Sequence, residues 1–229
     1  MLDSVTSMET RDARPSDARA LAELIAIAGA GIPEWLWAGM AGPGETPLDV
    51  GIRRAMRDHG GFSWRNAIVA EMNGQVSGMI LGYKLETDEG EPAAIDPVLL
   101  PFLELERLVP ESWYINAFAV YEPWRCRGVG GRLLTAAAER AKAAGCAEMS
   151  VQTFSQTPRS EAFYARYGFV RIESRPLPEP SVCAYGGDTV LLTRTLDNGT
   201  NAQKANHPVN VVVTETEQSR VMPNSDSGE

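Results

Sequence analysis

The stretch Arg125-Cys126-Arg127-Gly128-Val129-Gly130-Gly131 joins the best strand signal of the 229-residue chain to its strongest helix signal. Before it, residues 113–120 (WYINAFAV) are rich in aromatic and β-branched side chains, which favour a strand. After it, residues 129–144 are rich in alanine and leucine, place apolar side chains on one helical face, and are followed by Gly145 as a stop. A strand that passes through glycines directly into a helix predicts a binding site for a phosphate group.

The physical basis of this prediction lies in the start of the helix. The first backbone N–H groups have no partner within the helix, and the helix dipole adds partial positive charge there. The glycines remove the Cβ atoms that would hold a pyrophosphate away from these donors. Arg125, Arg127 and Arg132 add formal charge and forked hydrogen-bond donors around an anion.

Other phosphate-binding loops fit this stretch less well. A Walker A loop ends in Gly-Lys-Ser/Thr, whereas Gly131 is followed here by Arg132 and Leu133. A Rossmann fingerprint has its third glycine at the position of Leu133, and it normally follows a first strand rather than one in mid-chain. Taken alone, the glycines are also compatible with a tight turn that binds nothing.

The rest of the chain alternates strand and helix signals. Asn73-Gly74 lies between two apolar runs and predicts the tight turn of an antiparallel hairpin. The alternation in the second half of the chain predicts parallel neighbouring strands joined by crossover helices. The expected strands cover residues 7–14, 65–72, 75–85, 113–120, 147–154, 169–174 and 189–196, and the expected helices cover residues 18–28, 48–59, 129–144 and 158–167. Residues 32–47 and 86–101 are expected to be irregular.

At two places the sequence resembles the GNAT superfamily of N-acetyltransferases. Arg125-x-x-Gly128-x-Gly130 is similar to its coenzyme A signature, and residues 163–169 (FYARYGF) are similar to its second signature. The resemblance extends over roughly residues 8–196, and two signatures on the expected elements are more specific than either alone. It implies one α/β (mixed α+β) domain over residues 1–197, with a mixed, mostly antiparallel central sheet splayed at its middle strands and flanked by helices on both faces. Residues 198–229 are expected to form a polar tail, mostly disordered or adding one strand.

The resemblance also implies an activity. The chain would use acetyl-CoA as co-substrate and transfer the acetyl group to a primary amine, of a small molecule or a protein, by direct attack in a ternary complex. The backbone amides of residues 127–131 would hold the pyrophosphate, and the strand edge at residues 118–120 would pair with the pantetheine arm like an added strand. The implied cofactor-binding residues are Phe118, Ala119, Val120, Arg125, Cys126, Arg127, Gly128, Val129, Gly130, Gly131, Thr157 and Tyr164, with no metal. The alternative is a non-catalytic acyl-CoA-binding sensor or scaffold.

Two groups are implied at the thioester. A backbone N–H near Val120 is the family's usual donor to the oxyanion. Tyr164 aligns with the tyrosine that protonates the thiolate in many members; a phenol of pKa ~10 can do so at modest cost, because the thiol has a pKa of ~8.5. The alternative role of Tyr164 is an aromatic core anchor. Thr157 stands where the family often has asparagine, and it lacks the two-sided hydrogen bonding of an amide.

The general base is the least defined group of the expected site. Asn116 shares a strand face with Tyr114 and Phe118 by the two-residue period of a strand, and it could position a water or hold the amine. Glu106, or Glu104, could take the proton through water. The alternative for each glutamate is a solvated surface carboxylate.

Composition narrows the class of protein further. The net charge of −9 argues against a broad nucleic-acid-binding surface. No apolar run approaches the ~18 residues of a membrane span. Since the N-terminus also lacks a signal-peptide pattern, a cytoplasmic protein is expected. Three scattered cysteines and two histidines indicate neither a metal site nor a disulfide framework. The apolar patch at residues 209–213 could add a strand to a second copy, which would give a homodimer.

Overall fold

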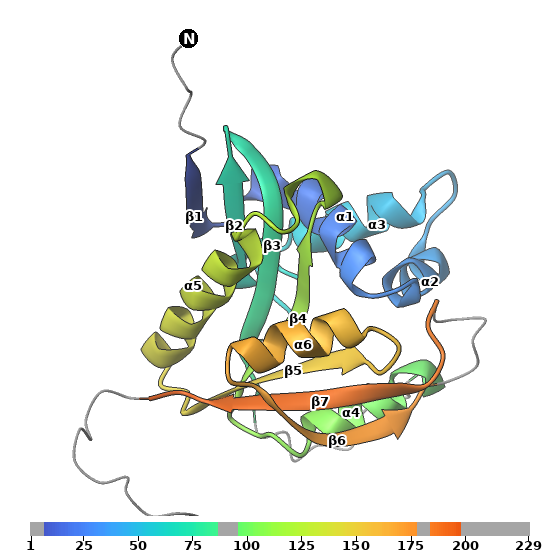
Figure 1. Ribbon diagram of the computed structural model, residues 1–229. Helices are drawn as coiled ribbons and strands as arrows, with labels where there is room; N and C mark the ends of the chain where they lie inside the picture. Colours follow the sequence, from blue (N-terminus) through green and yellow to red (C-terminus); the bar gives the residue numbers. More distant parts are fainter. Residues whose placement is uncertain (1–6, 87–95, 178–183, 198–229) are drawn as a thin grey trace, which may run out of the picture. The chain divides into compact units, whose positions relative to one another are not determined.

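The computed structural model of the protein describes residues 7–86, 96–177 and 184–197 (Figure 1). The expected tail from residue 198 onward lies outside the described residues, and so does its apolar patch. The strands are β1 (Met8–Asp12), β2 (Ala67–Met72), β3 (Gln75–Lys84), β4 (Trp113–Val120), β5 (Glu148–Phe154), β6 (Val170–Pro176) and β7 (Asp188–Thr195). The α-helices are α1 (Ala18–Ala28), α2 (Ile32–Met40), α3 (Pro47–Ala55), α4 (Leu100–Glu106), α5 (Val129–Ala143) and α6 (Pro158–Arg166).

The strands form one sheet in the order β1-β2-β3-β4-β5-β7-β6. Every neighbouring pair is antiparallel except β4 and β5, which are parallel. The sheet is therefore mixed and mostly antiparallel, as expected. The expectation of parallel neighbours throughout the second half is wrong, because β7 lies between β5 and β6 and runs antiparallel to both.

Helices cover both faces of the sheet (Figure 1). On one face, α5 packs against β2 and β3 and α6 packs against β5, with Leu133 and Leu134 fully buried between helix and sheet. On the other face, α1 packs against β4 and β3 through Leu21 and Ile25. Helices α2 and α3 pack in turn on α1. The two apolar cores hold the central strands from both sides, which is why those strands contain so few polar residues.

Two helices occur where irregular structure was expected. Residues 32–47 contain α2, in which Pro33 lies in the first turn. Residues 86–101 include a short 3₁₀ turn at Pro97–Leu99 and then α4, where Pro101 again lies in the first turn. Proline in a first helical turn removes an N–H group that has no helical partner, so it does not break the helix. Pro33, Pro97 and Pro101 therefore mark helix starts rather than loops.

The hairpin predicted at Asn73-Gly74 is confirmed. Both residues have positive φ, 52° and 78°, as a tight turn between paired strands requires. Strands β2 and β3 pair directly across it, from Met72 opposite Gln75 to Ala67 opposite Leu81. The hairpin places β3 beside β4, which is the strand that carries the site.

The sheet opens between β4 and β5. The two strands are paired only at Trp113, Tyr114 and Ile115, and beyond that point they diverge (Figure 1). The second half of β4, from Asn116 to Val120, is therefore bonded on one side, to β3, and open on the other. This is the splay expected from the family resemblance.

A β-bulge interrupts β4 at Asn116. In the pairing with β3, Leu81 lies opposite Ala117 and Gly82 opposite Ile115, so Asn116 has no opposite residue. A bulge reverses the alternation of side chains along a strand. Ile115 consequently packs into the same core as Phe118, on the α5 face. The expectation that Tyr114 shares a face with Phe118 is wrong for this reason, whereas Asn116 and Phe118 both line the pocket described below.

Candidate active site

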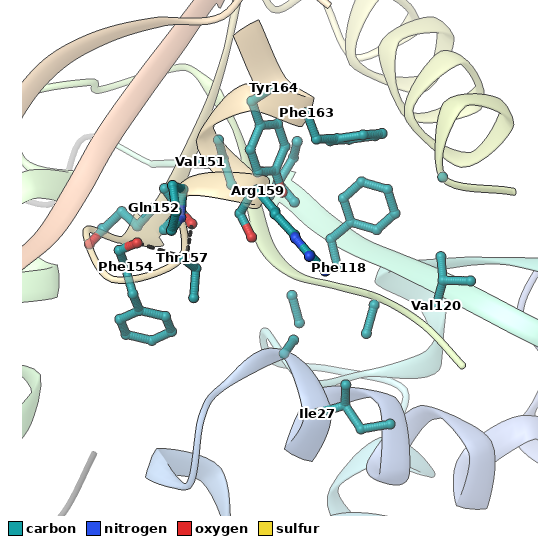
Figure 2. A pocket seen from close by; sticks show the side chains of 18 of the residues that line it. Ile27, Phe118, Val120, Val151, Gln152, Phe154, Thr157, Arg159, Phe163 and Tyr164 are labelled. Atoms are coloured by element: carbon teal, nitrogen blue, oxygen red, sulfur yellow. Dashed lines mark hydrogen bonds between the residues drawn. The ribbon is translucent and has the colours of Figure 1, made fainter. Parts of the chain in front are cut away.

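A pocket of about 730 Å³ lies where β4 and β5 part (Figure 2). Its walls come from β4, β5, the turn into α6, the start of α6, the loop before α5 and the end of α1. The predicted site residues that line it are Asn116, Phe118, Ala119, Val120, Arg125, Cys126, Gly130, Thr157 and Tyr164. The predicted residues that do not line it are Glu106, Arg127, Gly128, Val129 and Gly131.

The start of α5 presents free backbone donors at one end of this pocket. Gly128 is the N-cap residue with φ 83°, and no side chain caps the helix. The Arg132 N–H donates to the Gly128 carbonyl oxygen at 3.2 Å and closes the first turn. The N–H groups of residues 129–131 precede this bond and have no partner within the helix. The helix start therefore offers both amide donors and partial positive charge to an anion.

Two arginines flank the helix start. The Arg125 Nε donates to the Val120 carbonyl oxygen at 3.0 Å, so this side chain spans the gap between the loop and β4. The Arg127 guanidinium lies over the Trp124 ring, 5.4 Å from its centroid. Both side chains are exposed, but only Arg125 lines the pocket.

The glycines of the loop serve helix packing as well as ligand approach. A Cβ added at Gly130 would lie 3.3 Å from the Phe163 ring. A Cβ added at Gly131 would collide with the Tyr167 hydroxyl. Both aromatic residues belong to the second sequence signature, on or just after α6. Gly131 thus permits the close contact between α5 and Tyr167. From the sequence, this glycine was expected to serve phosphate binding alone.

The backbone of β4 turns its hydrogen-bonding groups toward the pocket at Val120. The next residue, Tyr121, donates its N–H to the Ser77 carbonyl oxygen, at 3.0 Å, on the β3 side. Because successive residues of a strand direct their N–H and C=O groups to opposite sides, those of Val120 point away from β3. The bond from Arg125 to the Val120 carbonyl oxygen agrees with this direction. Val120, and Phe118 two residues earlier, therefore present the open strand edge.

Tyr164 lies at the wall of the pocket within an aromatic cluster. Its ring meets Phe118, Phe163 and Phe169 at centroid distances of 6.2, 5.4 and 5.3 Å. Burial raises the pKa of Tyr164 well above its usual value, so the hydroxyl keeps its proton at neutral pH. The residue is both an aromatic anchor and a protonated donor at the pocket (Figure 2).

Thr157 uses its hydroxyl within its own turn. The Oγ1 donates to the Phe154 carbonyl oxygen at 2.7 Å, and the Thr157 N–H donates to the same oxygen at 2.8 Å. The hydroxyl also lies 3.3 Å from that of Thr153. A threonine hydroxyl that already donates its proton can only accept a hydrogen bond from a ligand. An asparagine amide would offer both a donor and an acceptor.

Glu106 lies apart from the pocket, at the last residue of α4. Burial raises the pKa of its carboxyl group to about 7, and the nearby Tyr114 hydroxyl offsets part of this rise. Tyr114 is itself buried and stacks edge-on with Tyr83, at 6.1 Å between centroids. Asn116, at the bulge, does line the pocket. The structure thus brings Asn116, but not Glu106, to the wall of the site.

The pocket also contains residues that sequence reasoning missed. Ile27 comes from α1, and Gln156 comes from the turn into α6. Arg159 lies in the first turn of α6, Phe154 is the last residue of β5, and Tyr185 precedes β7. Figure 2 shows the Arg159 side chain directed across the pocket toward Phe118. These residues belong to no common motif, and only the fold brings them together. Arg159 lies four residues before Phe163, where the second signature begins. This proximity is the sequence signal that could have indicated Arg159 as a pocket residue.

Within residues 7–86, 96–177 and 184–197, no group of three or more His, Cys, Asp or Glu side chains is placed to hold a metal ion. None of the helices there is long and apolar enough to cross a membrane. Cys126 is a free, exposed thiol in the glycine loop, and Cys146 is a free, buried one.

An open strand edge beside an uncapped, glycine-rich helix start is suited to an extended ligand that carries a phosphate group. Residues 32–169, more than half of the chain, match the acetyltransferase (GNAT) family. The chain therefore belongs to the GNAT acetyltransferase family, whose membership implies acetyl transfer from acetyl-CoA. No curated protein gives a significant sequence match to the chain.

Solved structures with a similar fold support this placement. An acetyltransferase crystal structure matches with a TM-score of 0.59 and 18% identity, over 82% of this chain and 100% of that one. An N-acetyltransferase from Staphylococcus aureus Mu50 matches with a TM-score of 0.56 and 18% identity, over 81% and 99%. The Salmonella typhimurium protein yncA, solved with its cofactor acetyl-CoA, matches with a TM-score of 0.55 and 16% identity, over 88% and 100%. At these identities the likeness is one of fold.

Proposed function

We propose that this protein transfers the acetyl group of acetyl-CoA to a primary amine by direct attack within a ternary complex. The observation that carries the proposal is the shared pocket, where the open edge of β4, the start of α5 and Tyr164 meet. Membership of the GNAT family supports the donor. The acceptor, the mechanism and the residue roles below are parts of the proposal.

The cofactor lies along the pocket in this proposal. Its pyrophosphate accepts hydrogen bonds from the backbone amides of residues 127–131, beside Arg125 and Cys126. Its pantetheine arm pairs with the edge formed by Phe118, Ala119 and Val120, as an added strand would. Thr157, on the opposite wall, contacts the arm more weakly than an asparagine would, because its hydroxyl already donates to Phe154.

The reaction begins when the neutral amine attacks the thioester carbonyl carbon. The negative charge that develops on the carbonyl oxygen is stabilised by the Val120 N–H, which faces the pocket. The C–S bond then breaks with its electron pair on sulfur, and the Tyr164 hydroxyl donates a proton to the thiolate. The tyrosinate, whose pKa is raised by burial, takes a proton back from solvent as CoA leaves. The surplus proton on nitrogen passes to a water held by Asn116, and further waters carry it to Glu106, which lies outside the pocket wall. A carboxylate with a pKa of about 7 is suited to accept a proton near neutral pH.

The proposal is tested by thiol release from acetyl-CoA with a panel of polyamines, amino acids, aminoglycosides, aromatic amines and peptides. We expect at least one primary amine to give acetyl-amine and free CoA in equal amounts. Acetyl-CoA binding by calorimetry, measured on the same protein, gives an independent readout of the donor site. Binding without thiol release from any amine would favour the non-catalytic acyl-CoA sensor instead.

A further inference from the structure

The pocket has two ends of different chemistry. One end is formed by the loop before α5, with Arg125, Cys126 and Gly130. The other is formed by Ile27, Phe154 and Tyr185, and Figure 2 shows Val120 and Phe154 on opposite sides of the pocket. Pyrophosphate and thioester lie at opposite ends of the pantetheine arm. In the proposed reaction, the acceptor amine therefore approaches from the end of the pocket that Phe154 lines.

The acceptor end is lined by exposed apolar surface. The rings of Phe154 and Tyr185 lie 5.4 Å apart between centroids and are tilted by 46°. Phe102 supports Phe154 from behind, edge-on at 6.3 Å. Tyr185 and Ile27 remain 36% and 47% exposed at the mouth. Apolar side chains gathered at the rim of a pocket mark a surface that a ligand covers.

This aromatic wall is anchored across the mouth. The N–H of Ala184, next to Tyr185, donates to the Ala30 carbonyl oxygen at 2.8 Å. Ala30 itself has a positive φ of 52°, in the turn that follows α1. The segment before β7 and the turn after α1 are thus joined on the far side of the pocket from the phosphate end, so Tyr185 has a defined position.

The charge of the pocket is positive. Among the described residues, Arg125 and Arg159 are the charged side chains that line it, and no carboxylate does. The Gln152 amide is already used, donating to the Phe102 carbonyl oxygen and accepting from Thr189. A second ammonium group on the acceptor would lose its hydration here and meet the Arg159 guanidinium in place of a counter-charge.

We propose that the acceptor is a primary monoamine carried by an aromatic or similarly bulky apolar group, which packs on Phe154 and Tyr185. Diamines and polyamines are disfavoured, because none of the described residues that line the pocket offers their second cation a carboxylate. The wall selects the body of the acceptor, while the amine itself is directed toward the thioester beside Tyr164. This inference rests on the proposed function and names the acceptor class of the same site.

The first experiment compares kcat/KM for phenethylamine and 1,4-diaminobutane, with the full chain and saturating acetyl-CoA. We expect phenethylamine to be favoured by about tenfold or more, the discrimination that a pocket of matched polarity achieves. A smaller or reversed preference overturns this inference while the acetyltransferase assignment stands. Absence of thiol release with every amine of the wider panel overturns both.

Variants at the acceptor end give the second readout. Tyr185→Ala is expected to raise the KM for phenethylamine about fivefold, since an aromatic contact is worth on the order of 1 kcal/mol, and to leave the KM for acetyl-CoA unchanged. Trp35→Ala is the matched control, because Trp35 is similarly exposed, at 41%, and does not line the pocket. Equal losses for phenethylamine and 1,4-diaminobutane in Tyr185→Ala would overturn the proposal.

A gain-of-function variant tests the charge argument. Gln156 lines the pocket beside this wall and is exposed, so Gln156→Glu adds a carboxylate of the same shape. We expect its kcat/KM for 1,4-diaminobutane to rise several-fold relative to that for phenethylamine. An unchanged ratio between the two amines would contradict the electrostatic part of the inference.

Discussion

Gly131 and Tyr167 lie so close that a Cβ at Gly131 would collide with the Tyr167 hydroxyl. The Tyr167 ring is held in place by Phe163, with 5.0 Å between the centroids. These residues come from the two sequence signatures, one at the start of α5 and the other at the end of α6. The loop proposed to hold the pyrophosphate and the helix that carries Tyr164 are therefore packed as one unit.

Gly131→Ala should destabilise the protein through this contact. Alanine is intrinsically the better helix residue, but crowding a rigid, packed ring costs about 1–3 kcal/mol and outweighs that gain. In a Tyr167→Phe background the colliding hydroxyl is gone, and the same substitution should be close to neutral. Urea unfolding of the single and double variants measures the difference. Equal destabilisation in both backgrounds would show that another contact sets the cost.

Gly128→Ala should weaken acetyl-CoA binding beyond its effect on stability. Gly128 has φ 83°, and a side chain there costs about 1–2 kcal/mol and shifts the amides at the start of α5. Gly145→Ala is a matched control, because Gly145 has φ 75° at the other end of the same helix. We expect similar losses of unfolding free energy, with a dissociation constant raised about tenfold in Gly128→Ala alone. Calorimetric titration with acetyl-CoA decides, and equal affinities would contradict the assigned loop.

Tyr164→Phe should lower kcat on the order of 100-fold or more, because it removes the proposed general acid. Acetyl-CoA affinity and stability should change little, since the ring and its contacts remain. Tyr167→Phe serves as the control: it removes a hydroxyl from the same signature, and Tyr167 does not line the pocket. If both variants turn over like the wild type, Tyr164 is an anchor rather than an acid.

Ionisation of Glu106 should give the pH–rate profile an acidic limb, which is a fall in kcat at low pH. Its raised pKa of about 7 means that the carboxylate form, the one able to accept a proton, is lost as pH falls below 7. At saturating amine, kcat should then fall about tenfold per pH unit below this value. Glu106→Gln should be slower and lack the limb, whereas Glu104→Gln, on the same helix but exposed and paired with Arg175, should retain it. A limb that persists in Glu106→Gln would assign it to another group.

The same raised pKa links folding to pH. On folding, the Glu106 pKa rises from 4.5 to about 7, so the folded state binds the proton more tightly than the unfolded state does. This contribution to stability is fully present below pH 4.5 and is lost as pH rises through 7. Glu106→Gln has no proton to lose, so its unfolding free energy should fall less between pH 5 and pH 8 than that of the wild type. Parallel curves for the two proteins would show that the carboxyl group is not buried as described.

Most of the helices and strands could be predicted from local sequence signals. Asn73-Gly74 predicted the hairpin, and the alanine-rich run after Gly128 predicted α5, because turn geometry and helical periodicity depend on neighbouring residues. Local reading failed at Pro33 and Pro101, where proline begins a helix rather than ending one. The motif residues of the pocket were predicted for the same reason, since Arg125, Gly130 and Tyr164 lie within two short signatures.

The sequence by itself determined the strand, glycine loop and helix that form the donor end of the pocket, because these are contiguous and follow local rules. Tertiary structure alone decided the insertion of β7 between β5 and β6, the bulge at Asn116, and the meeting of Phe154 with Tyr185. Each of these depends on which distant segments pair, and pairing is set by the packing of the whole sheet. The proposed donor end could therefore be predicted along the chain, whereas the proposed acceptor end exists only once the chain has folded.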